Sequence, residues 1–145
     1  MKPRLVFDAS AVAKWFLREE ESEEAKELRD LYLKKGKLEI FVPRQIFMEL
    51  ANALRYTRGL SPKDVIDAVE ALNALRLNVV EDEDVLKEAI KTAFEGDITV
   101  YDALYIALAR KLDSKLITYD EELLSRFKNM AARAKEALAE IREGK

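Results

Sequence analysis

Four short apolar runs alternate with segments of helical periodicity, and this alternation restricts the fold more than any other feature of the sequence. Short apolar strands separated by helices are typical of parallel βαβ units with right-handed crossovers. We therefore expect an α/β protein, a three-layer α/β/α sandwich around a central, mainly parallel sheet. The four runs are RLVF (4–7), LEIFV (38–42), LNVV (77–80) and KLIT (115–118).

The segments between these runs carry helix signals. Ser61, Pro62 and Asp64 have the spacing of an N-cap, a first-turn proline and a third-position acid. No stretch rich in Ser, Gly or Pro divides the chain, so we expect one domain over residues 1–145. The expected helices cover residues 10–17, opened by Ser10, then 22–35, 43–59, 61–75, 84–96 and 99–113, and the C-terminal part from Glu121.

The chain contains neither histidine nor cysteine. This excludes disulfides, thiolate nucleophiles, Cys/His zinc sites and imidazole acid–base chemistry. The 25 basic and 28 acidic residues give a net charge of -3, which argues against a broad polyphosphate-binding surface. No apolar run reaches the roughly 18 residues that span a bilayer, and the start MKPRLVFD does not resemble a signal peptide. We expect a cytoplasmic protein without membrane contact.

Two of the strand-like runs end at an aspartate. RLVF ends directly at Asp8, and KLIT leads through one further residue to Asp120. Parallel sheets bind ligands beyond the carboxyl ends of their strands, so these positions indicate a site. Aspartate is also a common N-cap where a strand passes into a helix. The sequence leaves both interpretations open.

Two further acids lie inside predicted helices. Asp102 belongs to YDALYIALA, which is apolar on nearly all sides, and a buried carboxylate is costly unless it is hydrogen-bonded or bound to a cation. Thr99 and Asp102 also have the spacing of a capping box. Glu49 lies at the border of an apolar stripe, where a snorkelling surface glutamate is the ordinary alternative. For Asp97, Glu121, Glu122 and the acidic run 19–24 we expect solvated charge without a role.

If the four singled-out carboxylates converge, like charges raise one another's pKa, and a hard divalent cation would relieve the repulsion. Oxygen-only ligation favours Mg²⁺ or Mn²⁺ over zinc. Such a site can activate water and neutralise the charge that develops on a phosphodiester. Ser10 and Thr118 lie beside the strand-end aspartates. Their hydroxyls could bind a ligand or a metal-bound water, or serve only local capping and strand formation.

Four fragments in this order, VFDASAVAKWF, MELANALR, YDALYIALA and LITYD, resemble the PIN-domain nucleases, especially the toxins of VapBC toxin-antitoxin pairs. The resemblance implies a compact α/β/α fold and a Mg²⁺- or Mn²⁺-dependent endoribonuclease with RNA as its substrate. It also implies a homodimer that is inhibited by a small antitoxin protein. By position, Asp8, Glu49 and Asp102 match the central metal-binding acids of the family, and Asp120 matches the more variable fourth.

One departure from the family concerns the C-terminus. Many members end with a further β-strand, whereas residues 128–145 have a helical pattern, so we expect a helical C-terminus and leave the fifth strand open. The motifs do not fix the phosphate contacts either. The basic candidates, each of which has ordinary surface charge as its alternative, are Lys14, Arg18, Arg44 and Arg55.

Other functions compete with the toxin. A housekeeping RNA-processing PIN nuclease would have the same acids, and a non-catalytic PIN-like module would bind RNA or protein without cleaving. Phosphotransfer through Asp8 is a third class, because VFDAS resembles the start of haloacid-dehalogenase-like phosphatases. Those enzymes usually carry a second aspartate where this chain has Ser10, which disfavours that class.

Overall fold

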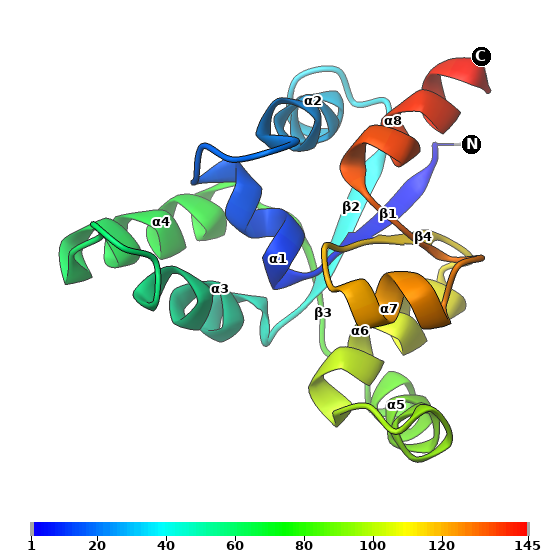
Figure 1. The fold of residues 1–145 in the computed structure, drawn as a ribbon. Helices are drawn as coiled ribbons and strands as arrows, with labels where there is room; N and C mark the ends of the chain where they lie inside the picture. The colour runs from blue at the N-terminus through cyan, green and yellow to red at the C-terminus, as the bar shows by residue number, and fades with distance from the viewer. Residues whose placement is uncertain (1, 145) are drawn as a thin grey trace.

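The computed structural model describes residues 2–144, with a parallel β-sheet at the centre (Figure 1). Within these residues the sheet has five strands in the order β3-β2-β1-β4-β5, and each neighbouring pair is parallel. The expected α/β class and the parallel sheet are confirmed. The strands are β1 Arg4–Phe7, β2 Glu39–Pro43, β3 Asn78–Val80, β4 Lys115–Ile117 and β5 Ala131–Ala132.

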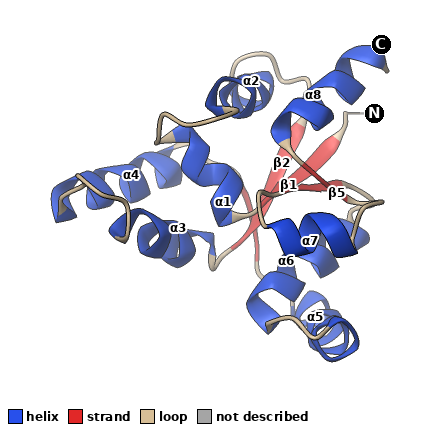
Figure 2. Ribbon diagram, viewed as in Figure 1, coloured by secondary structure: helices blue, strands red, loops and turns tan. Residues whose placement is uncertain are grey.

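Helices cover both faces of the sheet (Figure 2). The helix α6 Val100–Lys111 packs on β1, β2 and β4, and α5 Glu83–Gly96 packs on α6. On the other side, α2 Ser22–Leu33 contacts β2, α8 Ala134–Glu143 contacts β4, and these two helices pack together. The remaining elements are α1 Ala9–Val12, the 3-10 helix η1 Ala13–Trp15, α3 Ile46–Arg55, α4 Pro62–Ala74 and α7 Glu121–Arg126.

The strand β1 lies between β2 and β4 because it is apolar on both faces. Leu5, Val6 and Phe7 are buried, as is usual for a parallel strand that helices cover from both sides. Leu5 lies opposite Ile40 of β2 and Lys115 of β4. The carboxyl ends of β2, β1 and β4 are therefore adjacent at one edge of the sheet.

Most helix signals are confirmed, and two differ in detail. Ser61 and Asp64 form the expected capping box of α4. The first helix is opened by Asp8, not by Ser10, because the Asp8 carboxylate accepts from the N–H of Ala11. The helix α5 includes Gly96, and the left-handed residue that closes it is Asp97, with φ 52°. Aspartate adopts this conformation more readily than most residues.

The C-terminal part is not helical throughout. Leu116 N–H donates to the carbonyl of Met130 at 2.7 Å, and Thr118 N–H donates to that of Ala132 at 3.0 Å, so Ala131–Ala132 form a short fifth strand beside β4. Alanine favours helix locally, but the two hydrogen bonds to the edge of β4 outweigh that preference. The helix α8 then gives the expected helical C-terminus. In the described part of the chain, no helix is long and apolar enough to cross a bilayer.

Candidate active site at the carboxyl edge of the sheet

The four acids singled out in the sequence lie after the strands or at the start of a helix. Asp8 follows β1 and Asp120 follows β4. Glu49 lies in the first turn of α3, which follows β2, and Asp102 lies in the first turn of α6. Because β2, β1 and β4 are neighbours in the sheet, their carboxyl ends bring Asp8, Asp120 and the start of α3 to one edge, where parallel sheets bind ligands. The start of α6 lies beside that of α3, because Gln45 Nε2 donates to the Tyr101 carbonyl at 2.9 Å.

Asp8 is the most enclosed of the four acids, with 7% of its surface exposed. One carboxylate oxygen accepts from Ser10 Oγ at 2.6 Å and from the Ala11 N–H at 3.1 Å, and the other accepts from Thr118 Oγ1. Burial raises the pKa of Asp8 from 3.8 to about 6, although these three hydrogen bonds oppose the shift and the charge of Asp102 adds to it. Ionised Asp8 is therefore costly to the folded protein.

The two candidate hydroxyls both donate to Asp8. Ser10 Oγ also accepts from the N–H of Tyr119 at 2.8 Å, and Thr118 Oγ1 accepts from the N–H of Asp120 at 3.1 Å. Each hydroxyl thus joins the Asp8 carboxylate to the backbone of residues 119–120. Their position supports a role in orienting Asp8, and a hydroxyl that donates to the carboxylate has no second proton to give a ligand.

Glu49 is held by two residues that the sequence reasoning missed. Tyr105 OH donates to one of its oxygens at 2.6 Å, and Gln45 Nε2 donates to the other at 2.9 Å. Burial raises the pKa of Glu49; the Tyr105 bond opposes this shift, and the charges of Asp102 and Asp8 add to it. Tyr105 is only 1% exposed. A phenol on a helix predicted to be buried needs a polar partner, and that signal was available in the sequence.

Asp120 has the capping role that the sequence left open, and Asp102 has one half of the expected capping box. Asp102 N–H donates to Thr99 Oγ1 at 3.0 Å, and Asp120 caps α7 by accepting from the Leu123 N–H at 3.0 Å. The pKa of Asp102 is raised by burial and then by the charge of Asp120. Capping and membership of the acidic group are therefore compatible, since the Asp102 bond uses its backbone N–H and the Asp120 carboxylate has lone pairs beyond the one that caps α7.

The acids lie close enough to feel one another's charge. Asp102 raises the pKa of both Asp8 and Glu49, and Asp120 raises that of Asp102. In residues 2–144, however, no three acidic side chains stand in position to hold one ion together. The donor set still fits a hard divalent cation, because it consists of carboxylates alone and Asp8 and Glu49 retain lone pairs beyond the bonds described above.

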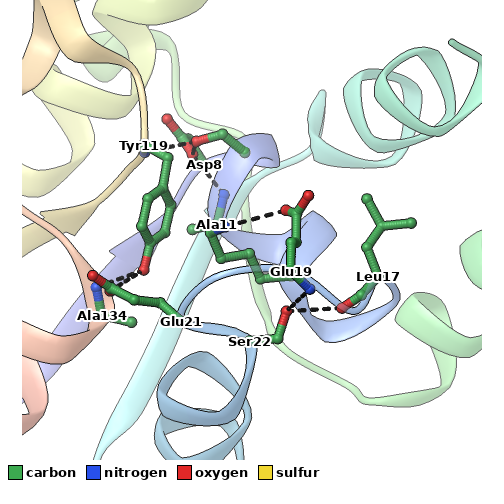
Figure 3. A network of polar contacts seen from close by, with 10 residues as sticks. Asp8, Ala11, Leu17, Glu19, Glu21, Ser22, Tyr119 and Ala134 are labelled. Carbon is green, nitrogen blue, oxygen red and sulfur yellow. Dashed lines mark hydrogen bonds and ion pairs between the residues drawn. The ribbon is translucent and has the colours of Figure 1, made fainter. Parts of the chain in front are cut away.

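Two of the neighbouring charged residues, Lys14 and Glu21, are not simple solvated surface charges. Lys14, a candidate phosphate contact, is buried, with Nζ 3.2 Å from Glu19 and 4.3 Å from the centre of the Tyr119 ring. The expectation of a wholly solvated acidic run is wrong at Glu21, which accepts from Tyr119 OH (Figure 3). Glu21 also accepts from the Lys135 N–H. The other basic candidates are all exposed, as expected for ordinary surface charge: Arg18, Arg44 and Arg55.

Residues 5–132, from β1 to β5 and including all four acids, match the family described as PIN domain. The chain belongs to the PIN-domain family. This PIN-domain protein is also 36% identical over 134 residues to Ribonuclease VapC3 from Pyrobaculum aerophilum, a match that covers 86% of this chain and 95% of that relative. The resemblance carried by the four sequence fragments is therefore confirmed.

Solved structures share the fold of this PIN-domain protein at lower identity. PAE2754 from Pyrobaculum aerophilum has a TM-score of 0.70 and 23% identity over 99% of this chain and 98% of that one. VapC20 from Mycobacterium tuberculosis, described as a Sarcin-Ricin loop cleaving toxin, has a TM-score of 0.64 and 15% identity over 84% and 95%. A toxin-antitoxin complex from Klebsiella pneumoniae has a TM-score of 0.63 and 17% identity over 90% and 97%.

Proposed function

We propose that this PIN-domain protein is an endoribonuclease that uses Mg²⁺ or Mn²⁺ to hydrolyse RNA phosphodiester bonds, with residues 1–145 acting as a single nuclease domain. The observation that carries the proposal is the group of acids at one sheet edge, in which the charges of neighbouring acids raise the pKa of Asp8, Glu49 and Asp102. Such repulsion favours the binding of a cation. Similarity to Ribonuclease VapC3 supports RNA as the substrate.

The metal would be held by carboxylates alone. When bound, Mg²⁺ or Mn²⁺ supplies an activated water and neutralises charge on the phosphate. Without that positive charge the acidic edge would repel an RNA backbone, so the same residues serve both binding and chemistry. The proposed ligands and catalytic acids are Asp8, Glu49, Asp102 and Asp120.

The chain's own residues orient these acids and handle the proton. Ser10 and Thr118 fix the plane of the Asp8 carboxylate, and Tyr105 fixes Glu49. One carboxylate of the group accepts the proton of the attacking water, which reaches the phosphorus in line with the leaving oxygen.

We further propose that the nuclease is a cytoplasmic toxin that a small antitoxin protein inhibits. Its similarity to Ribonuclease VapC3 and the shared fold with a protein in a toxin-antitoxin complex support this assignment. A housekeeping RNA-processing nuclease is the alternative within the same chemistry. Release of growth arrest by a co-expressed small protein from the neighbouring reading frame would favour the toxin, and growth unaffected by expression of the active enzyme would favour the housekeeping role.

We also propose a homodimer, because α5 exposes an apolar stripe. Leu86, Ile90 and Phe94 are spaced by four residues, and Phe94 is 86% exposed. The stripe adjoins a groove of about 600 Å³ that Met48, Leu86 and Leu104 line. A contiguous apolar surface of this kind is unusual on a soluble monomer. A second copy would cover it with the same face, as in a two-fold symmetric dimer.

The nuclease is tested with purified protein and RNA in the presence of Mg²⁺ or Mn²⁺. Cleavage should depend on the metal, stop on addition of EDTA, and be lost in Asp8→Asn and Asp102→Asn while both variants stay folded. Asp67→Asn is a matched control, because Asp67 forms only an exposed pair with Lys63. Cleavage that survives both site substitutions would overturn the site assignment. Tight RNA binding without turnover under all metals would favour the non-catalytic binding module.

A further inference from the structure

Tyr119 contacts three separate parts of the molecule (Figure 3). Its backbone N–H donates to Ser10 Oγ at 2.8 Å, beside Asp8. Its hydroxyl donates to Glu21 Oε1 at 2.6 Å and accepts from the Ala134 N–H at 3.0 Å. Its ring lies beneath the buried ammonium of Lys14. One residue, through its backbone and its side chain, thus joins the acidic edge to the N-terminal ends of α2 and α8.

Glu21 completes the attachment of α8. The same Oε1 atom accepts from the Lys135 N–H at 3.0 Å. The first N–H groups of a helix have no partner within it, so Tyr119 and Glu21 together satisfy two of those of α8. Glu21 does this from a left-handed backbone conformation with φ 66°, which residues other than glycine rarely adopt. The helix begins at residue 134, just beyond the residues that match the PIN domain.

The segment that Tyr119 fixes is the one that holds Asp8. Thr118, the preceding residue, donates to one Asp8 oxygen, and Ser10, which donates to the other, is bonded to the Tyr119 backbone. The following residue is Asp120, itself one of the four acids. A shift of the Tyr119 backbone would therefore move both hydroxyl partners of Asp8, and Asp120 with them.

We propose that Tyr119 is a positioning residue which, together with Glu21, makes the C-terminal helix α8 a support for Asp8 and Asp120. This inference rests on the proposed function, since it concerns the same acidic group. The phenol stays protonated and keeps donating, because burial and the bond to Glu21 raise the pKa of Tyr119. The helix remains docked without these bonds, because it also packs on α2 and β4 and pairs Arg142 with Glu27.

The test compares the full chain with Tyr119→Phe, Glu21→Ala and Glu21→Gln. Tyr119→Phe and Glu21→Ala should lose exchange protection at the Ala134 or Lys135 N–H, measured by NMR. Their Mn²⁺ dissociation constants, measured by calorimetry, should rise about 3–10-fold, less than the roughly 10–100-fold typical of a group bonded directly to a ligand. On RNA, kcat should fall while KM stays unchanged. Glu21→Gln keeps an acceptor oxygen and should restore wild-type values.

Tyr32→Phe is the matched control. Its hydroxyl donates to the Arg76 carbonyl at 2.7 Å, so the variant loses the same kind of bond away from residues 118–120 and should bind Mn²⁺ as the wild type does. Unchanged Mn²⁺ binding in both Tyr119→Phe and Glu21→Ala would overturn the inference, even if the Ala134 and Lys135 N–H groups lose their exchange protection. A wild type that binds Mn²⁺ but cleaves no RNA contradicts only the proposed function. A wild type that binds no Mn²⁺ overturns both.

Discussion

Replacing Asp8 by asparagine should abolish cleavage and stabilise the protein at neutral pH. The carboxylate of Asp8 is buried, and burial raises its pKa from 3.8 to about 6. At pH 7 the folded protein therefore holds an ionised group in a place that disfavours charge. Asparagine has nearly the same shape, can still accept from Ser10 and Ala11 with its oxygen, and carries no charge.

The expected change in stability follows from the pKa shift of Asp8 and from the hydrogen bonds that its carboxylate accepts. The shift of Asp8 corresponds to roughly 3 kcal/mol of lost stability at pH 7, at about 1.4 kcal/mol per pKa unit. The amide nitrogen that Asp8→Asn introduces cannot accept from Thr118, which costs about 1 kcal/mol. The net gain of about 2 kcal/mol should raise Tm by about 4–8 °C for a chain of this length.

The gain should depend on pH with a definite sign. Below the unfolded pKa of 3.8, Asp8 is protonated in both the folded and the unfolded wild type, so its charge contributes nothing. Between 3.8 and about 6 the folded state holds the extra proton, and wild-type stability therefore falls as pH rises. The advantage of the variant should grow across this window and stay constant above it.

The assay is urea unfolding of the wild type and Asp8→Asn in EDTA at several values between about pH 3.5 and 7.5, a range that brackets both pKa values, with Asp67→Asn as the surface control. A variant that is less stable than the wild type at pH 7 would refute the reasoning, because the cost of the buried charge would then be absent. The same conclusion would follow if the gain were equally large at the acidic end of the range.

Three further outcomes follow from the structure. Tyr105→Phe should raise the pKa of Glu49 further and lower kcat by about 10–100-fold, with Tyr32→Phe unaffected; equal loss in both variants would point to general destabilisation. Saturating Mg²⁺ or Mn²⁺ should raise the wild-type Tm, since a ligand that binds only the folded state stabilises it, and should not raise that of Asp8→Asn; calorimetric scans decide this. Phe94→Glu should yield a monomer in sedimentation experiments if α5 forms the dimer contact, and a variant with unchanged mass would exclude that face.

The framework of the site could be predicted because local patterns determine it. The run RLVF must form a buried strand, so Asp8 has to lie at a strand end, and KLIT fixes Thr118 and Asp120 in the same way. The all-round apolarity of YDALYIALA likewise predicted that α6 is buried, as it is from Ala103 to Ala109 except at Leu104.

The supporting contacts could not be predicted because they join distant parts of the chain. Tyr105 and Glu49 are 56 positions apart, and Tyr119 and Glu21 are 98 apart, so no local spacing indicates either pair. The glutamate run 19–24 has the composition of a solvated segment, and only the tertiary fold brings the Tyr119 hydroxyl and the Lys135 N–H of α8 to Glu21. The strand β5 could not be predicted for a related reason. Ala131 and Ala132 favour helix locally, and they form a strand only because they pair with the edge of β4.

The central place of β1 has a consequence for protein synthesis. The strand β1 needs β4 on one side, and the Asp8 carboxylate needs the hydroxyl of Thr118, 110 positions later in the chain. A nascent chain therefore cannot assemble the acidic edge until Thr118 has left the ribosome, because such long-range pairings form only when both partners are available. The proposed catalytic acids stay apart until the fourth strand has been synthesised.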